Sequence, residues 1–149
     1  DPATSRSTIG GYIKLGEYGL IYAKSSLQRK VMTSTGHSET AALESWCKEN
    51  KALKVLAAEF GLQLGATACG VDNAGVVKQA INAVNSAQAK HYRVEQAFIR
   101  ENVSDGLVRL ENVASEDNAA DFFTKALGAK LFIKHRLVIM GPQEKPQEL

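Results

Sequence analysis

The sequence predicts an α/β fold whose sheet contains strands of both directions. Short β-rich runs separated by Gly and Ser open the chain, which is typical of an antiparallel meander. A long stretch with helical periodicity follows, and short apolar runs then alternate with amphipathic segments. The expected order is β-β-β-α-β-α-α-β-α, with no internal repeat and no linker long enough to divide the chain.

The opening strands are predicted from alternating apolar and polar residues. We expect strands over residues 9–15 and 20–24, joined by a turn at 16–19. A polar break is expected at Ser25 and Ser26, followed by a third, short strand over residues 30–33. These runs indicate a meander at the start of the sheet.

A long amphipathic helix is predicted from about residue 38 to 60. Its apolar residues recur at steps of three and four, charged residues fill the opposite face, and Gly61 ends it. Residues 66–71 form a short apolar run suited to the middle of a sheet. A helix through residues 76–84 comes next.

The last third predicts two helices around one strand. We expect a helix over residues 92–102, with Val94, Ala97 and Phe98 facing inward. A turn then leads into a strand over residues 107–113, and a last helix over residues 115–128 carries acids in its first turn. The polar residues 142–149 are expected to form a mobile tail.

Composition narrows the classes of protein. The 149 residues fit one domain, and 44% hydrophobic with 23% charged residues is globular usage. No apolar run is long enough for a membrane-spanning helix, and the start, which has no Met, indicates a piece of a longer chain. A net charge of +2 does not by itself indicate a nucleic-acid binder.

Cys47 and Cys69 are expected to be small buried apolar residues, and the compartment is expected to be reducing and intracellular.

Three acids stand where predicted elements meet: Glu39 at the start of the long helix, Asp72 after the apolar strand, and Asp121 in the last helix. Ligands of open α/β sheets gather at the carboxyl ends of strands. Converging carboxylates suit Mg²⁺ or Mn²⁺, and two such ions can hydrolyse a phosphodiester. From the residues alone, solvated acids or helix caps are the favoured explanation of this pattern.

Six stretches in order resemble the ribonuclease H domain of copia-type (pseudoviral) retrotransposon polyproteins. Residues 34–43 are similar to that family's SSTEAEYIAL word, and Asp72 with Asn73 to its DN word. The full series consists of residues 1–12, 23–31, 34–43, 71–73, 90–101 and 113–125. The resemblance implies a ribonuclease H-like domain over residues 1–141, with a mixed five-stranded sheet flanked by helices.

The resemblance also implies the chemistry. The family's metal-binding carboxylates fall on Glu39, Asp72 and Asp121, which would hold two Mg²⁺ or Mn²⁺ ions and hydrolyse the RNA strand of an RNA–DNA hybrid. The hybrid would be recognised through its minor-groove shape and 2′-hydroxyls. The residues expected beside its groove, by resemblance or by charge and position, are Asn73, Lys24, Arg29, Lys30, Lys90, His91 and Arg93.

One part of the family pattern is missing. A first catalytic Asp and its central strand precede the matched region in the family, whereas this chain begins at Asp1, which matches a later, non-catalytic acid. Unpaired backbone groups on the flanking strands would each cost about 1–3 kcal/mol. We therefore expect this N-terminally truncated domain to receive the strand from upstream chain or from a partner.

Two classes of function follow. The first is an enzyme, the ribonuclease H of a retrotransposon reverse transcriptase polyprotein, acting in a cytoplasmic virus-like particle with the reverse transcriptase portion as partner. The second is an inactive, retroelement-derived module that serves as a structural or binding subunit. An unrelated metal-dependent nuclease of the same fold is a lesser alternative. Cleavage of an RNA–DNA hybrid discriminates between them.

Overall fold

The computed structural model describes residues 6–17, 19–28, 34–82 and 93–141. The chain divides into two compact units, one formed by residues 1–29 and 116–149 and the other by residues 30–115. Two sequence predictions, the strand over residues 30–33 and the tail over 142–149, lie outside the described residues. The single domain expected over residues 1–141 stays a prediction. Across the described ranges, no helix combines the length and the apolar character needed to cross a membrane.

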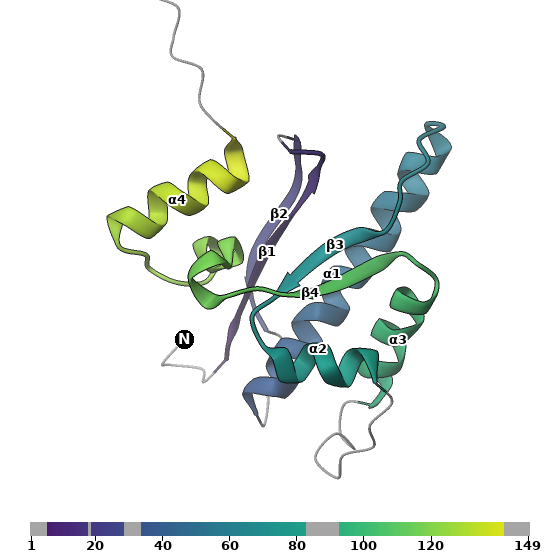
Figure 1. The fold of residues 1–149 in the computed structure, drawn as a ribbon, viewed down its shortest axis with the longest axis horizontal. Coiled ribbons are helices and arrows are strands. Elements are labelled where there is room, and N and C mark those ends of the chain that lie inside the picture. The colour runs from purple at the N-terminus through teal and green to yellow at the C-terminus, as the bar shows by residue number, and fades with distance from the viewer. Residues whose placement is uncertain (1–5, 18, 29–33, 83–92, 142–149) are drawn as a thin grey trace, which may run out of the picture. The chain divides into compact units, whose positions relative to one another are not determined.

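The first unit contains an antiparallel strand pair and the C-terminal helix. Strands β1 (Thr8–Leu15) and β2 (Gly19–Leu27) pair from Thr8 opposite Leu27 to Leu15 opposite Gly19. Two short 3₁₀ helices, η2 (Ser115–Asp117) and η3 (Ala119–Phe123), precede α4 (Ala129–Met140) (Figure 1). The expected break at Ser25 and Ser26 is wrong, because both residues pair with β1 and Ser25 Oγ also donates to the Phe123 carbonyl at 2.6 Å.

Aromatic rings and one glycine join η3 to its own unit. Phe122 stacks on Phe132 of α4 with ring centroids 4.9 Å apart, and Phe123 lies 6.1 Å from Tyr12 of β1. At Gly10 of β1, a Cβ would stand only 2.6 Å from Phe123 Cβ, so only glycine admits this close approach. The segment that carries Asp121 is therefore packed tightly on β1.

The second unit holds a parallel strand pair and three helices. Strand β3 (Thr67–Val71) pairs with β4 (Val108–Asn112) from Thr67 opposite Val108 to Val71 opposite Asn112. The helices are α1 (Thr35–Glu59), α2 (Ala74–Ile81) and α3 (Arg93–Ser104) (Figure 1). Their common core consists of Leu43, Cys47, Val76, Val77, Ala80, Ile99, Val108 and Leu110.

A buried amide ties α1 to the strand pair of this unit. Asn50 of α1 is 6% exposed, and its Nδ2 donates to the Leu107 carbonyl at 3.2 Å. Its Oδ1 accepts from Thr67 Oγ1 at 2.8 Å. Both ends of the buried amide are therefore hydrogen-bonded, as burial of a polar group requires.

The predicted α/β class is confirmed, and the antiparallel and parallel strand pairs are compatible with the predicted sheet of mixed strand directions. The described residues hold two separate two-stranded sheets in place of the five-stranded sheet that the resemblance implies. Cys47 is buried as expected, and Cys69 is half-buried against the same core.

Two helix predictions are wrong in detail. The single helix expected over residues 115–128 is replaced by η2 and η3, and α4 begins where that helix was expected to end. Gly128 has φ −63° and ψ 154° and is the N-cap of α4, so this glycine starts a helix instead of ending one. In α3 the buried residues are Gln96, Ile99 and Asn102, whereas Val94 is 79% exposed. Ala97 is exposed as well, whereas Phe98 packs against the core as predicted.

Candidate active site

Glu39 lies near the start of α1, where local hydrogen bonds fix the helix. Ser34 is the N-cap residue, and its Oγ accepts from the His37 amide at 3.2 Å. One turn later, the buried Thr40 Oγ1 donates to the Gly36 carbonyl at 2.8 Å. Glu39 is half-buried on this well-defined turn.

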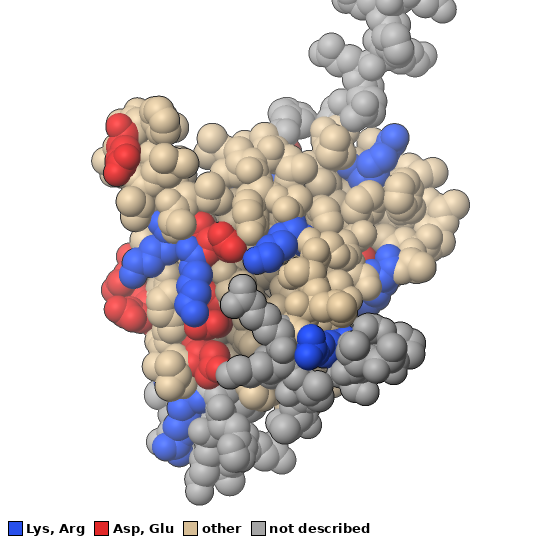
Figure 2. Space-filling model, turned by 180° about the vertical axis from the view of Figure 1, so that it is seen from behind, with Lys and Arg blue, Asp and Glu red and all other residues tan. Residues whose placement is uncertain are grey.

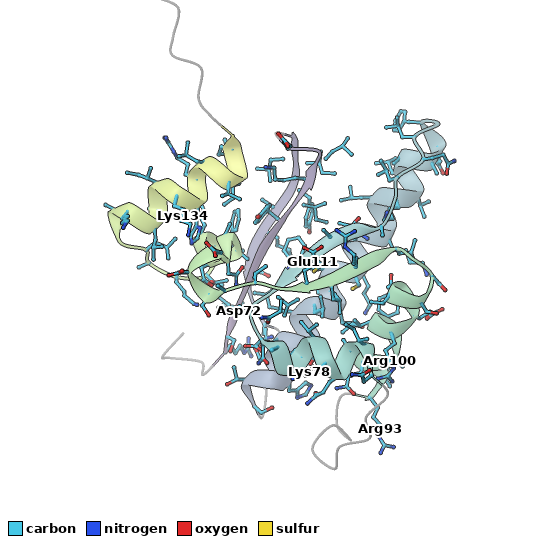
Figure 3. All side chains as sticks on the ribbon, in the orientation of Figure 1. Asp72, Lys78, Arg93, Arg100, Glu111 and Lys134 are labelled. Carbon is cyan, nitrogen blue, oxygen red and sulfur yellow. The ribbon has the colours of Figure 1, made fainter. Side chains whose placement is uncertain are left out.

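Asp72 and Asn73 follow β3 directly. The ladder continues to the end of the strand, because the Val113 amide donates to the Val71 carbonyl at 3.0 Å. Asp72 is half-buried at this carboxyl end, where the chain turns into α2 (Figure 3). Asn73 is the N-cap of α2, and its Oδ1 accepts from the amides of Gly75 at 2.9 Å and Val76 at 3.2 Å.

One hydrogen bond joins these two segments. Asn73 Nδ2 donates to Glu39 Oε2 at 2.5 Å, although the residues are 34 positions apart in sequence. Glu39 is thereby held against the residue that follows Asp72. Within this unit the structure brings together the segments that carry two of the three predicted carboxylates.

Asp121 belongs to the other unit, where it lies in η3. Its Oδ2 pairs with Lys125 Nζ at 2.9 Å; the carboxylate side chain is 15% exposed and the lysine 58%. The Asp121 carbonyl accepts from the amides of Thr124 and Lys125 at 3.1 and 3.0 Å, so the backbone of this turn is satisfied. The convergence of Asp121 with Glu39 and Asp72 stays a prediction.

The residues predicted to contact nucleic acid are only partly described. Lys24 lies in β2 opposite Gly11, and Arg93 is the exposed first residue of α3 (Figure 3). Arg29, Lys30, Lys90 and His91 lie outside the described residues. On the face shown in Figure 2, acidic and basic side chains lie next to each other.

The donor chemistry of Glu39 and Asp72 fits a hard divalent cation. Both supply carboxylate oxygens, and Mg²⁺ is commonly held by one or two carboxylates, with water and substrate phosphates completing its shell. In the part of the chain that the structure describes, no three His, Cys, Asp or Glu side chains gather into a group that could hold a metal ion. A site on Glu39 and Asp72 therefore requires further oxygen ligands.

The two cysteines do not add to this site. Burial is the main cause that raises the pKa of Cys47 to about 12, with smaller contributions from Cys69 and Glu44. Burial, together with Glu111, raises the pKa of Cys69 to about 11. Both thiols stay protonated at neutral pH, which disfavours them as nucleophiles or metal ligands.

Two partners of the predicted acids were missed by sequence reasoning. Asn73 caps α2 and binds Glu39, whereas it was predicted only as a nucleic-acid contact. An asparagine directly before an apolar helix is a usual capping signal and predicts the first role. Lys125 stands four residues after Asp121, a spacing that favours an ion pair on a helix.

Comparison with curated proteins finds transposon polyproteins. The chain is 29% identical over 127 residues to the retrovirus-related Pol polyprotein from transposon RE2 of Arabidopsis thaliana, and 85% of the chain but 9% of that protein is covered. The corresponding protein of transposon TNT 1-94 from Nicotiana tabacum is 29% identical over 128 residues, covering 86% of the chain and 10% of the relative. That of transposon RE1 from Arabidopsis thaliana is 28% identical over 127 residues, with 85% and 9% covered.

These homologues are much longer than the chain, which spans about a tenth of their length. No family model matches the chain, and no solved structure gives a significant match. The comparisons therefore support a retroelement polyprotein context.

Proposed function

We propose that this chain is the ribonuclease H domain of a copia-type retrotransposon polyprotein, which hydrolyses the RNA strand of RNA–DNA hybrids. The homologues are retrovirus-related Pol polyproteins of plant transposons, which supports the retroelement context. The observation that carries the proposal is the Asn73–Glu39 hydrogen bond, because it holds one predicted catalytic acid beside the segment that carries another.

The fold proposed for this function has a central strand between β1 and β3. Among the described residues, β2 is the one strand paired with β1, and β4 is the one strand paired with β3. Each of these strands therefore has one edge to which a further strand could add its backbone hydrogen bonds. We propose that upstream chain or a partner supplies this strand, together with the first catalytic Asp.

In the proposed mechanism, Glu39, Asp72 and Asp121 would hold two Mg²⁺ or Mn²⁺ ions through their carboxylate oxygens. Such a pair of ions activates a water molecule and stabilises the leaving oxygen of a phosphodiester. Asp121 is paired with Lys125, whose side chain is largely exposed, so an ion bound by Asp121 would have to compete with this lysine. The carboxylates, and not the protonated cysteines, are the proposed reactive part of the site.

The proposed substrate is read by shape. A hybrid presents 2′-hydroxyls and phosphates along its minor groove, and sequence-independent contacts suffice to bind it. We assign this binding to Asn73, Lys24, Arg29, Lys30, Lys90, His91 and Arg93. The proposed setting is an intracellular, cytoplasmic virus-like particle, with the reverse transcriptase portion of the polyprotein as partner.

Cleavage of a labelled RNA–DNA hybrid in Mg²⁺ or Mn²⁺ tests this function. Asp72→Asn keeps the shape of the side chain but removes its charge, and we expect cleavage to fall at least about 100-fold, since ion-assisted steps supply several kcal/mol. Asp105→Asn is the matched control, because Asp105 lies exposed in the turn after α3. Equal activity of the Asp72→Asn variant would refute the assigned site.

Binding of the hybrid without any cleavage would support the inactive structural module instead. A chain supplied with the missing strand as a synthetic peptide is the decisive comparison, because the enzyme hypothesis expects the peptide to increase cleavage.

A further inference from the structure

We infer that Asn73 is a positioning residue whose amide fixes the Glu39 carboxylate at the junction of β3 and α2. The contact itself is independent of the proposed function, whereas its consequence for metal binding rests on that function. The side chain uses both of its ends: Nδ2 donates to Glu39 Oε2, and Oδ1 accepts from two amides at the start of α2.

The orientation of the amide is set by its partners. A carboxylate only accepts hydrogen bonds, and the amides of Gly75 and Val76 only donate them. Turning the Asn73 side chain over would place its oxygen against the Glu39 carboxylate and its NH₂ against two N–H groups. Only one orientation therefore satisfies all three contacts, and it directs the donor toward Glu39.

The surroundings leave the amide little room to move. A Cβ at residue 75 would lie 3.0 Å from Asn73 Oδ1, so the glycine there lets the cap form at close range. The backbone of Asn73 is fixed as well, because its carbonyl accepts from the Val77 amide at 3.1 Å. On the other side, the capped start of α1 holds Glu39.

A donated amide hydrogen has a specific chemical effect on a carboxylate. It fixes the plane of the carboxylate and satisfies part of its acceptor capacity without neutralising its charge. An acidic residue at position 73 would instead repel Glu39, and a residue without a donor would remove this restraint on the carboxylate.

A double-mutant cycle measures the contact in the absence of metal. Asn73→Ser keeps a good capping oxygen but has no NH₂ group, Glu39→Ala removes the acceptor, and the third variant combines both. We expect each single substitution to lower the melting temperature of the 149-residue chain by about 2–6 °C. The melting temperature of the double variant should be little lower than that of the less stable single variant. Losses that simply add would overturn the inference.

Asn50→Ala is the matched control for general destabilisation. Asn50 lies on the same helix, 11 residues from Glu39 and so about 16 Å along the axis, and its amide binds Leu107 and Thr67 instead. Its loss of stability should add to that of Glu39→Ala, because well-separated sites are independent.

Calorimetric titration with Mn²⁺, at a temperature where every variant is folded, tests the positioning role. Loss of a residue that orients a ligand typically weakens metal binding about 10–100-fold, and we expect this for Asn73→Ser but not for Asn50→Ala. Unchanged Mn²⁺ affinity of Asn73→Ser beside a binding wild type would overturn the positioning role. If the wild-type chain binds no Mn²⁺, the proposed function fails, and the cycle alone decides whether Asn73 holds Glu39.

Discussion

Gly10→Ala is the perturbation whose consequence follows most directly from packing. Gly10 lies in β1 opposite Ser25, with η3 packed against it. An added Cβ would meet Phe123 Cβ and Thr124 Cγ2 at 2.6 Å, and the Phe123 carbonyl carbon at 3.0 Å. Contacts this short force a shift of the η3 backbone, because two of these atoms are not at the flexible end of a side chain.

The size of the effect follows from overpacking, which costs about 1–3 kcal/mol. We expect the upper part of this range for Gly10→Ala, equivalent to a melting temperature lower by about 4–10 °C in a chain of this size. Thermal and urea unfolding followed by circular dichroism measure it. The shift should also displace Asp121, which lies in the same 3₁₀ helix.

Gly36→Ala provides a control in which the same substitution is expected to have the opposite effect on stability. A Cβ at Gly36 has nothing within 4 Å, and residue 36 lies in the first turn of α1. Alanine is favoured over glycine in a helix by up to about 1 kcal/mol, so this variant should be as stable as the wild type or more so. Equal destabilisation by both substitutions would refute the packing argument.

Three further outcomes are expected. Folding raises the pKa of Cys47 to about 12 and that of Cys69 to about 11. Their contribution to the free energy of unfolding is therefore complete below the ordinary thiol pKa and is lost as pH rises from about 9 to 12. Urea unfolding across this range measures the loss, and a free energy of unfolding that does not change with pH would contradict it. Ile99→Ala should cost about 2–5 kcal/mol, because the side chain is fully buried, whereas Val94→Ala, at a 79% exposed position, should stay within about 0.5 kcal/mol. Lys125→Ala should change stability by less than about 1 kcal/mol, because the lysine is exposed, but should tighten Mn²⁺ binding by freeing its carboxylate partner in η3; weaker binding would contradict the proposed ligand set.

The sequence predicted the elements whose signals are local and long. The helix ended by Gly61 is confirmed as α1, and that glycine has the positive φ of 75° that a helix terminus favours. Strands β1, β3 and β4 also lie within one residue of their predicted bounds. Periodicity over several turns and apolar alternation are sufficient for such elements.

The errors occurred where one local signal has two structural outcomes. Gly128 was interpreted as a helix end, yet a glycine occurs at either end of a helix, and in the structure it is the N-cap of α4. In α3, Val94 is apolar but exposed, while Gln96 is polar but buried. Burial of Gln96 is tolerated because its Nε2 donates a hydrogen bond to Gln79 Oε1 at 3.1 Å. Residue type alone does not reveal such a hydrogen bond.

In the candidate site, too, the sequence predicts the features that depend on local signals but not those that depend on tertiary packing. Resemblance selected Glu39 and Asp72, and the structure brings their segments together, but nothing local in the sequence pairs residue 39 with residue 73. That contact depends on how α1 packs in its unit. The capping half of the Asn73 role is a local signal, whereas the half that holds Glu39 is tertiary.

Paramagnetic broadening by Mn²⁺ tests the central claim most directly, which is that three carboxylates distant in sequence share one metal site. An isotope-labelled chain is titrated with Mn²⁺ while the amide signals of residues 39, 72 and 121 are followed by NMR. The account predicts that all three signals broaden together at the same low ratio of Mn²⁺ to protein, and that Asp72→Asn weakens the effect at all three. Broadening at residues 39 and 72 with no change at residue 121 would contradict it.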